Sequence, residues 1–154
     1  MKTLKPLLPL LVVLAASQSK AVSWRIFGAC KNSPVHEGTY QADLTKSVGA
    51  LSLEIFDANK IPYVGSAEGI NSIINSPIGL DSIEVVSDTE LRAYGWCYTI
   101  NGKQPTEMPD KIQFKSQDDK LTWFYAYSTN KNNEWTDYCS PAYWIAADQF
   151  CAKN

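Results

Sequence analysis

Histidine, closely spaced cysteines and standard catalytic motifs are scarce or absent in this 154-residue chain. The one histidine, His36, would have to serve any histidine-based mechanism, and no Gly-x-Ser-x-Gly motif accompanies it. No two of the four cysteines have the Cys-x-x-Cys spacing of a zinc site, and no Asp-x-Asp-x-Asp-Gly loop is present for calcium. We therefore interpret His36 as a surface or hydrogen-bonded strand residue, and we expect neither a metal site nor a cofactor.

Clustered positive charge is also missing. The whole chain has a formal net charge of -2, from 14 basic and 16 acidic residues. Three of the lysines, Lys2, Lys5 and Lys20, precede the segment that we expect to fold, which leaves that segment more acidic still. A nucleic-acid-binding domain normally has a basic patch, so we expect no nucleic-acid partner.

The first 21 residues have the pattern of a signal peptide. Two early lysines precede an apolar stretch, Leu7 to Ala16, that is short for crossing a bilayer, and Ser19-Lys20-Ala21 supplies small residues at a cleavage site. An uncleaved membrane anchor is the alternative. Cleavage near Ala21 would leave one domain, 22-154, without membrane insertion and located in the periplasm or secreted.

Export places the four cysteines in an oxidising compartment, where they are expected to form two disulfides. Three pairings are possible. We favour Cys97 with Cys139, which ties a central strand to a later segment, and Cys30 with Cys151, which ties the two ends of the domain.

The most regular stretch runs from Tyr94 to Gly102. Alternation places Tyr94, Trp96, Tyr98 and Ile100 on one face, which predicts a strand, and Asn101-Gly102 predicts a tight turn after it. The run from Leu121 to Tyr127 predicts a second aromatic strand.

One helix is expected between about Asp43 and Lys60. Asp43 is the predicted N-cap, and four apolar residues at helical spacing form the predicted buried face: Leu44, Val48, Leu51 and Ile55. Pro62 then prevents the helix from continuing.

The remaining strands are short. We expect a hairpin from 23–30 and 35–41, two strands at 70–74 and 82–86 joined by a turn, and a C-terminal coil from 135 with one short helix at 146–150. Hairpin, helix and then strands is the order of a β-grasp. The predicted fold is therefore an α+β, two-layer domain with one helix packed on a mixed sheet.

Three segments carry a family resemblance: Gly95 to Gly102, Leu121 to Tyr125 and Cys139 to Tyr143. They resemble a family of exported bacterial domains of unknown function that is similar to the C-terminal domain of transcobalamin and intrinsic factor. Ile100 stands where that family usually has valine, and Cys97 and Cys139 resemble a subgroup feature. The resemblance implies a β-grasp-like fold and no enzyme. It does not imply cobalamin binding by this chain alone, because the vitamin carriers also use a large helical barrel.

Aromatic density gives the main functional hypothesis. Five residues on the two aromatic strands are the candidate ligand-binding residues: Trp96, Tyr98, Trp123, Tyr125 and Tyr127. Together with the loop from Lys103 to Asp110 they would bind a small ligand or an envelope protein, as an exposed aromatic patch does. The same residues could instead be core, which would favour a structural or accessory envelope module.

A hydrolase is the third alternative. It would use one of two carboxylate pairs, Asp118 with Asp119 or Glu134 with Asp137, as glycosidases do. Both pairs fall in predicted turns, where acidic residues commonly serve the turn itself. We therefore predict a non-catalytic domain.

Overall fold

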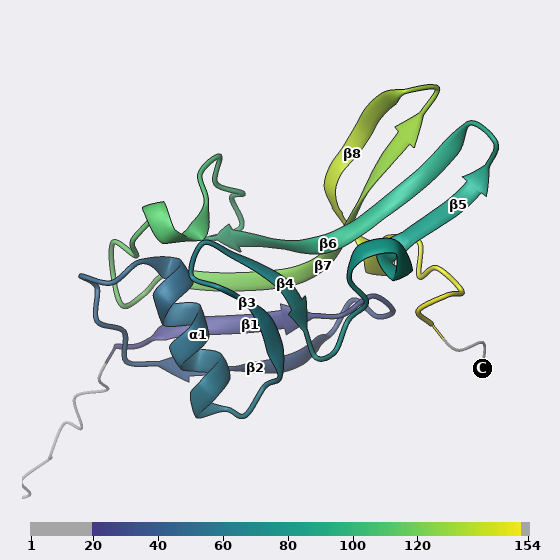
Figure 1. The fold of residues 1–154 in the computed structure, drawn as a ribbon. Coiled ribbons are helices and arrows are strands. Elements are labelled where there is room, and N and C mark those ends of the chain that lie inside the picture. The colour runs from purple at the N-terminus through teal and green to yellow at the C-terminus, as the bar shows by residue number, and fades with distance from the viewer. Residues whose placement is uncertain (1–19, 152–154) are drawn as a thin grey trace, which may run out of the picture.

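The computed structural model describes residues 20–151, so the expected signal segment lies almost wholly outside the described residues. Within 20–151, no helix is long and apolar enough to cross a membrane. One helix, α1 (Val48–Ala58), packs on a mixed sheet, as predicted (Figure 1). The main sheet contains β1 (Val22–Phe27), β2 (Pro34–Tyr40), β5 (Ile83–Ser87), β6 (Glu90–Ile100), β7 (Lys120–Lys131) and β8 (Glu134–Pro141). A small separate sheet contains β3 (Tyr63–Ser66) and β4 (Gly69–Ile73).

The two aromatic strands, β6 and β7, form the centre of the sheet. They pair antiparallel over their length, so that Tyr94 faces Tyr127, Trp96 faces Tyr125 and Tyr98 faces Trp123. These six side chains therefore lie on one face of the sheet, as the alternation predicted. Asn101 and Gly102 follow with φ values of 53° and 75°, which confirms the predicted tight turn.

The other edge of β7 is shared by two strands. β1 pairs with its first half in parallel, from Ser23 opposite Lys120 to Phe27 opposite Phe124, and β8 pairs antiparallel with the second half from Ala126 onward. The β5–β6 and β7–β8 hairpins extend beyond the part of the sheet that α1 covers (Figure 1). They remain joined there, because β6 pairs with β7 as far as Glu90 opposite Lys131.

The helix begins later than predicted. Its N-cap is Ser47, whose side chain accepts a hydrogen bond from the Ala50 backbone N–H at 3.2 Å. Asp43 instead closes a preceding turn, where its carboxylate accepts from the backbone N–H and the hydroxyl of Thr45. Leu44 is consequently outside the helix and half-buried, whereas Val48, Leu51 and Ile55 are buried as predicted.

Gly49 sets the distance between α1 and the β3–β4 hairpin. A Cβ atom at this position would collide with the backbone carbonyl of Ala67, in the turn of that hairpin. Close approach of the two backbones therefore requires glycine here, although glycine disfavours a helix by about 1 kcal/mol relative to alanine.

The two strands predicted at 70–74 and 82–86 are present as β4 and β5, but the predicted turn that joins them is wrong. β4 pairs with β3 in the small sheet, and β5 pairs with β6 in the main sheet. The chain leaves β4 through Ile74 and Asn75, which both have positive φ, so it turns away before it reaches β5.

The predicted C-terminal coil from 135 is also wrong. Asn132 and Asn133, with φ values of 51° and 66°, form a turn, and β8 then uses the edge of β7 that β1 leaves free. In place of the short helix predicted at 146–150, the chain makes a 3-10 turn at Ala142–Trp144 and further turns after it.

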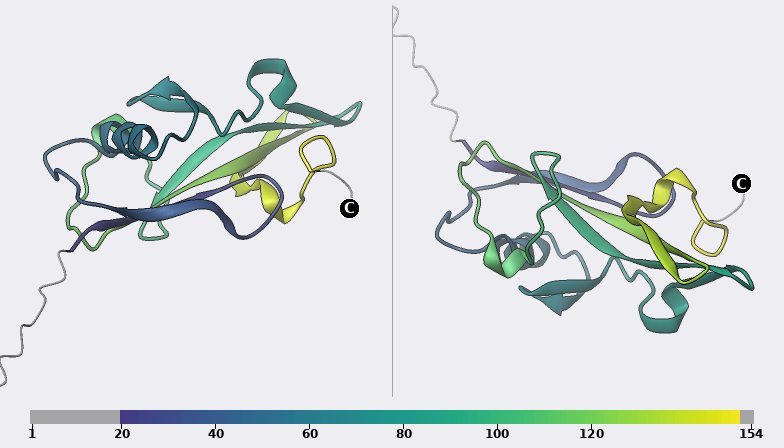
Figure 2. Two further views of the ribbon diagram at one scale, coloured as in Figure 1. Left: turned by 90° about the horizontal axis from the view of Figure 1, so that it is seen from below. Right: turned by 90° about the horizontal axis from the view of Figure 1, so that it is seen from above.

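Apolar side chains form two clusters on the aromatic face. The larger lies between α1 and the sheet and includes Ile26, Leu51, Phe56, Tyr98 and Trp123. The second lies farther along β6 and β7, where the C-terminal segment covers Tyr94, Tyr125 and Tyr127. Figure 2 shows α1 and the small sheet on one side of the main sheet, and the C-terminal segment near the β5–β6 and β7–β8 hairpins. The site described next lies between these two clusters.

Candidate ligand pocket

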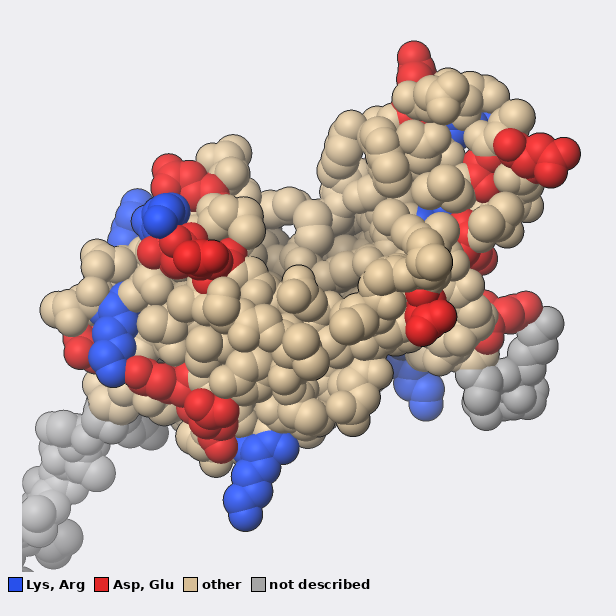
Figure 3. Space-filling view, viewed as in Figure 1, with Lys and Arg blue, Asp and Glu red and all other residues tan. Residues whose placement is uncertain are grey.

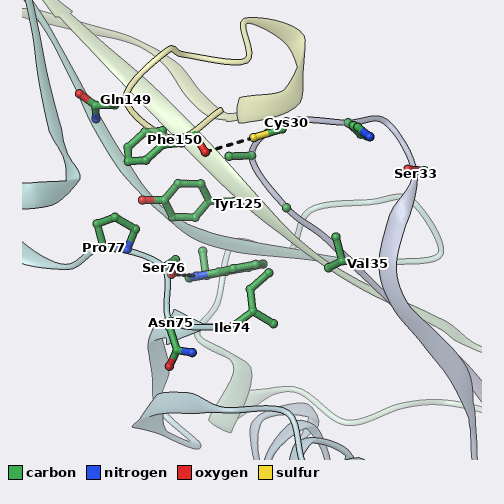
Figure 4. A pocket seen from close by; sticks show the side chains of 14 residues that line it. Cys30, Ser33, Val35, Ile74, Asn75, Ser76, Pro77, Tyr125, Gln149 and Phe150 are labelled. Atoms are coloured by element: carbon green, nitrogen blue, oxygen red, sulfur yellow. Dashed lines mark hydrogen bonds between the residues drawn. The ribbon is translucent and has the colours of Figure 1, made fainter. Parts of the chain in front are cut away.

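A pocket of about 460 Å³ opens where the two apolar clusters meet (Figure 4). Four segments enclose it: the β1–β2 connection, the 74–77 loop after β4, the central strands and the end of the C-terminal segment. Its lining is Gly28, Ala29, Cys30, Lys31, Ser33, Val35, Ile74, Asn75, Ser76, Pro77, Trp96, Tyr125, Gln149 and Phe150. Lys31, an exposed residue, is the one charged side chain among these lining residues.

Trp96 and Tyr125, which face each other across β6 and β7, contribute aromatic rings to the pocket. Their ring centroids lie 5.4 Å apart with the planes inclined at 53°. The Trp96 indole N–H donates to the Ser76 hydroxyl at 2.7 Å, and the Ser72 hydroxyl donates to the Ser76 carbonyl at 2.7 Å. These hydrogen bonds fix Trp96 against the 74–77 loop, so this part of the pocket is preformed.

The C-terminal segment forms the opposite wall. The Phe150 ring packs edge-on against the rings of Tyr125 and Tyr94, with centroid distances of 5.5 Å and 4.6 Å. The adjacent Cys151 is disulfide-bonded to Cys30 in the β1–β2 connection, so this covalent link joins two walls of the pocket.

Tyr125, a lining residue, has a buried hydroxyl. The residue is 2 % exposed, and its hydroxyl has no hydrogen-bond partner within the described part of the chain. Burial raises the pKa of Tyr125 to about 12, so the phenol keeps its proton at neutral pH. A buried donor without a partner costs about 1–3 kcal/mol, which makes this hydroxyl an unusual feature of the fold.

The five predicted binding residues separate into three groups. Trp96 and Tyr125 line the pocket. Trp123 lies under α1, where its indole N–H donates to the Ser52 hydroxyl at 3.0 Å, and Tyr98 donates from its hydroxyl to the Glu107 carbonyl at 2.8 Å. Tyr127 packs in the second cluster, with the Arg92 guanidinium 5.9 Å from its ring centre. The aromatic face therefore contributes both to the two apolar clusters and to the pocket.

The 103–110 loop lies beside a second groove, of about 380 Å³. Residues 104–109 line this groove together with three of the predicted binding residues, Trp96, Tyr98 and Trp123. Figure 3 shows the surface hollowed between that loop and the β7–β8 hairpin. Trp96 thus contributes to both depressions, whereas the loop does not line the pocket.

Both predicted disulfides are confirmed. Cys30 is bonded to Cys151 and Cys97 to Cys139. The second bond connects β6 to β8 across β7, the strand that lies between them.

The carboxylate pairs serve local structure. Asp119 is buried and accepts hydrogen bonds from the Asn101 amide and from the backbone N–H groups of Lys115 and Ser116. Burial alone would raise the pKa of Asp119, but these hydrogen bonds outweigh it and lower the pKa. This carboxylate therefore stabilises the turn, as predicted. Glu134 and Asp137 are exposed on β8, and His36 is exposed on β2.

Sequence reasoning missed Ser76, Phe150 and the β1–β2 connection as parts of a site. One signal was available, because the favoured Cys30–Cys151 disulfide already placed Phe150 beside the β1–β2 connection. The contact of the 74–77 loop with Trp96 had no such signal, since it depends on where β4 ends.

Comparisons with known proteins leave the family open. No protein-family model matches the chain, and no curated protein matches it. Among solved structures, the chain is similar to a protein of Ruminococcus gnavus described as a "putative metal binding protein". The two are 14 % identical with a TM-score of 0.41, over 70 % of this chain and 99 % of the other. Within 20–151, no group of three or more His, Cys, Asp or Glu residues is placed to hold a metal ion.

Proposed function

We propose that this protein is an exported, non-catalytic binding domain whose site is the pocket lined by Trp96 and Tyr125. The observation that carries the proposal is a pocket of about 460 Å³ with fixed aromatic rings. One of its lining residues, Tyr125, has a buried hydroxyl without a hydrogen-bond partner among residues 20–151. Ligand sites in proteins are typically clefts of about 300–1,000 Å³ lined by apolar and aromatic groups with a few polar ones. The arrangement suits recognition of a small molecule.

Export is supported by the two disulfides, since such bonds persist in oxidising compartments. The proposed location is the periplasm or the extracellular space, after removal of the predicted signal peptide.

We further propose the β-grasp-like assignment and membership of the transcobalamin C-terminal-like family. Support comes from the order of elements, in which the β1–β2 hairpin precedes α1 and the remaining strands follow. The helix covers one face of the mixed sheet, as in that fold (Figure 2). In this proposal the chain shares the domain architecture and binds a ligand of its own rather than cobalamin.

A protein partner is a second candidate, favoured by the exposed surface of the β8 region. Trp135 and Tyr138 on β8 are 44 % and 69 % exposed, and Trp144 after it is 67 % exposed. β8 is also an edge strand, and an exposed edge can accept a further strand from another protein.

The test is recovery of the ligand with the exported protein. The full chain is expressed in its native host, purified after export, and analysed by mass spectrometry for a co-purified small molecule. Gly28→Leu is the blocking variant, because a Cβ at Gly28 would lie 3.6 Å from Val35 and 3.9 Å from Ile74, both in the pocket lining. Gly95→Leu is the matched control, since a Cβ there meets nothing within 4 Å and Gly95 does not line this pocket.

A small molecule bound to the wild type and to Gly95→Leu, but lost from Gly28→Leu, is the expected result. Retention by Gly28→Leu would contradict the site. Recovery of a protein alone, lost on Trp135→Ala and Tyr138→Ala, would favour the second candidate.

A further inference from the structure

We propose that the pocket selects an uncharged, planar and mainly apolar molecule that carries one hydrogen-bond acceptor, and that the Tyr125 hydroxyl donates to that acceptor. This inference rests on the proposed function and specifies its ligand class.

The shape and apolar character follow from the lining. Trp96 and Tyr125 present aromatic rings, Phe150 adds a third, and Val35 and Ile74 contribute aliphatic groups. Flat aromatic molecules pack well against such rings in offset or edge-on arrangements. The planes of Trp96 and Tyr125 are inclined at 53°, so a flat ligand that lies on one of these rings would meet the edge of the other.

That the ligand is uncharged follows from the exposed positions of the charged and amide lining residues. The charged lining residue, Lys31, is exposed, and the amide side chains Asn75 and Gln149 are exposed as well. A charged group deep in the pocket would meet no opposite charge from the described lining residues, and burying an unpaired charge is costly. A neutral ligand avoids that cost.

The need for an acceptor on the ligand follows from which polar groups of the lining already have a hydrogen-bond partner in the protein. The Trp96 N–H is satisfied by Ser76, and the Ser76 hydroxyl lies 3.2 Å from that of Ser72. Tyr125 is the aromatic lining residue whose polar hydrogen has no partner in the described chain. A ligand acceptor within reach of it would satisfy a group that the fold itself leaves unpaired.

Phe150 packs against the ring that carries this hydroxyl. Tyr125 is almost fully buried, and the half-buried Phe150 ring lies edge-on to it in a segment attached through Cys151. In this proposal the Phe150 side chain rotates to admit the acceptor, and the disulfide stays intact.

The test uses 9-fluorenone and fluorene, which are planar and nearly isosteric and differ by a carbonyl acceptor. Their affinities for the exported protein are measured by calorimetric titration. The wild type is expected to bind fluorenone about two- to tenfold more tightly than fluorene, the usual effect of one hydrogen bond. Tyr125→Phe removes only the hydroxyl and is expected to abolish the preference. Tyr98→Phe is the matched control, because its hydroxyl is used in the loop contact with Glu107, and it is expected to keep the preference.

Equal affinity of the wild type for the two compounds, or a preference that survives Tyr125→Phe, would overturn the inference. If both compounds bind equally and Gly28→Leu abolishes binding, the ligand class is wrong while the pocket remains a binding site. If neither compound binds, the ligand class is likewise wrong, and the proposed function is then judged separately by the co-purification experiment.

Discussion

At the scale of single residues, Tyr125 combines a structural cost with a functional opportunity. Its ring belongs to the second apolar cluster, while its hydroxyl is buried and has no hydrogen-bond partner in the described part of the chain. Removing only the hydroxyl should therefore leave the fold intact, which is uncommon for so buried a polar residue.

Alkaline pH provides the first prediction. The pKa of Tyr125 is raised from 10.0 to about 12 in the folded state, so the folded protein holds this proton more tightly than the unfolded chain. The resulting contribution to stability is complete below pH 10 and is lost as the pH rises from 10 through 12. Tyr125→Phe should be as stable as the wild type or more stable at pH 7, and should lose less stability between pH 9 and 11, measured by urea unfolding.

Tyr98→Phe is the comparison at neutral pH. It removes the hydrogen bond to the Glu107 carbonyl and should cost about 0.5–1.5 kcal/mol. A larger loss at pH 7 for Tyr125→Phe than for Tyr98→Phe would show that the Tyr125 hydroxyl has a partner.

Trp123 gives the second prediction. It is 2 % exposed between β7 and α1, and its ring lies 6.4 Å from that of Phe56. Trp123→Ala should cost roughly 3–5 kcal/mol, because it leaves a cavity and removes the hydrogen bond from the indole N–H to the Ser52 hydroxyl. Thermal melts should show little change for Trp135→Ala, since Trp135 is substantially exposed on β8. Unchanged melting of Trp123→Ala would mean that this residue does not belong to the core.

At the scale of elements, the start of α1 differs between sequence and structure, and this difference yields the third prediction. Ser47→Ala should cost about 0.5–2 kcal/mol, because Ser47 is the residue that caps the helix. Asp43→Ala should cost less, since Asp43 closes only an exposed turn. Chemical denaturation of the two variants compares them directly, and the opposite ranking would restore Asp43 as the cap.

Elements with a regular apolar pattern were predictable from sequence. Strand pairings that depend on the path of the connecting loops were not. β6 and β7 alternate so regularly that their shared aromatic face followed from local pattern alone. Asp43 and Ser47 are both residue types that commonly cap helices, so local sequence does not choose between them. The observed start of the helix, at Val48, is accompanied by a long-range hydrogen bond from the Val48 N–H to the Ile112 carbonyl. β8 was missed because five of its eight residues are exposed and none is buried, so no apolar periodicity marks it. The pocket was missed for a related reason, since its walls come from loops.

At the scale of the whole molecule, the two disulfides constrain loops of different length, and this difference gives the fourth prediction. The bond between Cys30 and Cys151 spans 121 residues and that between Cys97 and Cys139 spans 42. In the chain-entropy description these bonds contribute roughly 5 and roughly 4 kcal/mol. Replacing each pair with alanine should therefore lower the melting temperature in both cases, and more for Cys30 with Cys151.

The variant without the Cys30–Cys151 bond should also differ from the wild type in its affinity for fluorenone. Without the Cys30–Cys151 bond the wall that carries Phe150 is no longer tied to the β1–β2 connection, so fluorenone should bind more weakly. Loss of the Cys97–Cys139 bond, which does not border the pocket, should leave fluorenone affinity unchanged once the protein is folded.

The shared edge of β7 has a consequence for the order of events in folding. β1 pairs with a strand almost a hundred positions later in the chain, since Ser23 lies opposite Lys120. The β6–β7 and β7–β8 pairs, by contrast, join strands that are consecutive in the sequence. High contact order of this kind slows the search for the native topology, and parallel pairing is intrinsically slow to form. The β1–β2 hairpin therefore docks late, onto a β6–β7–β8 meander that is already assembled. Until then, the first half of β7 exposes an unpaired edge, the place where a folding intermediate of this protein would aggregate.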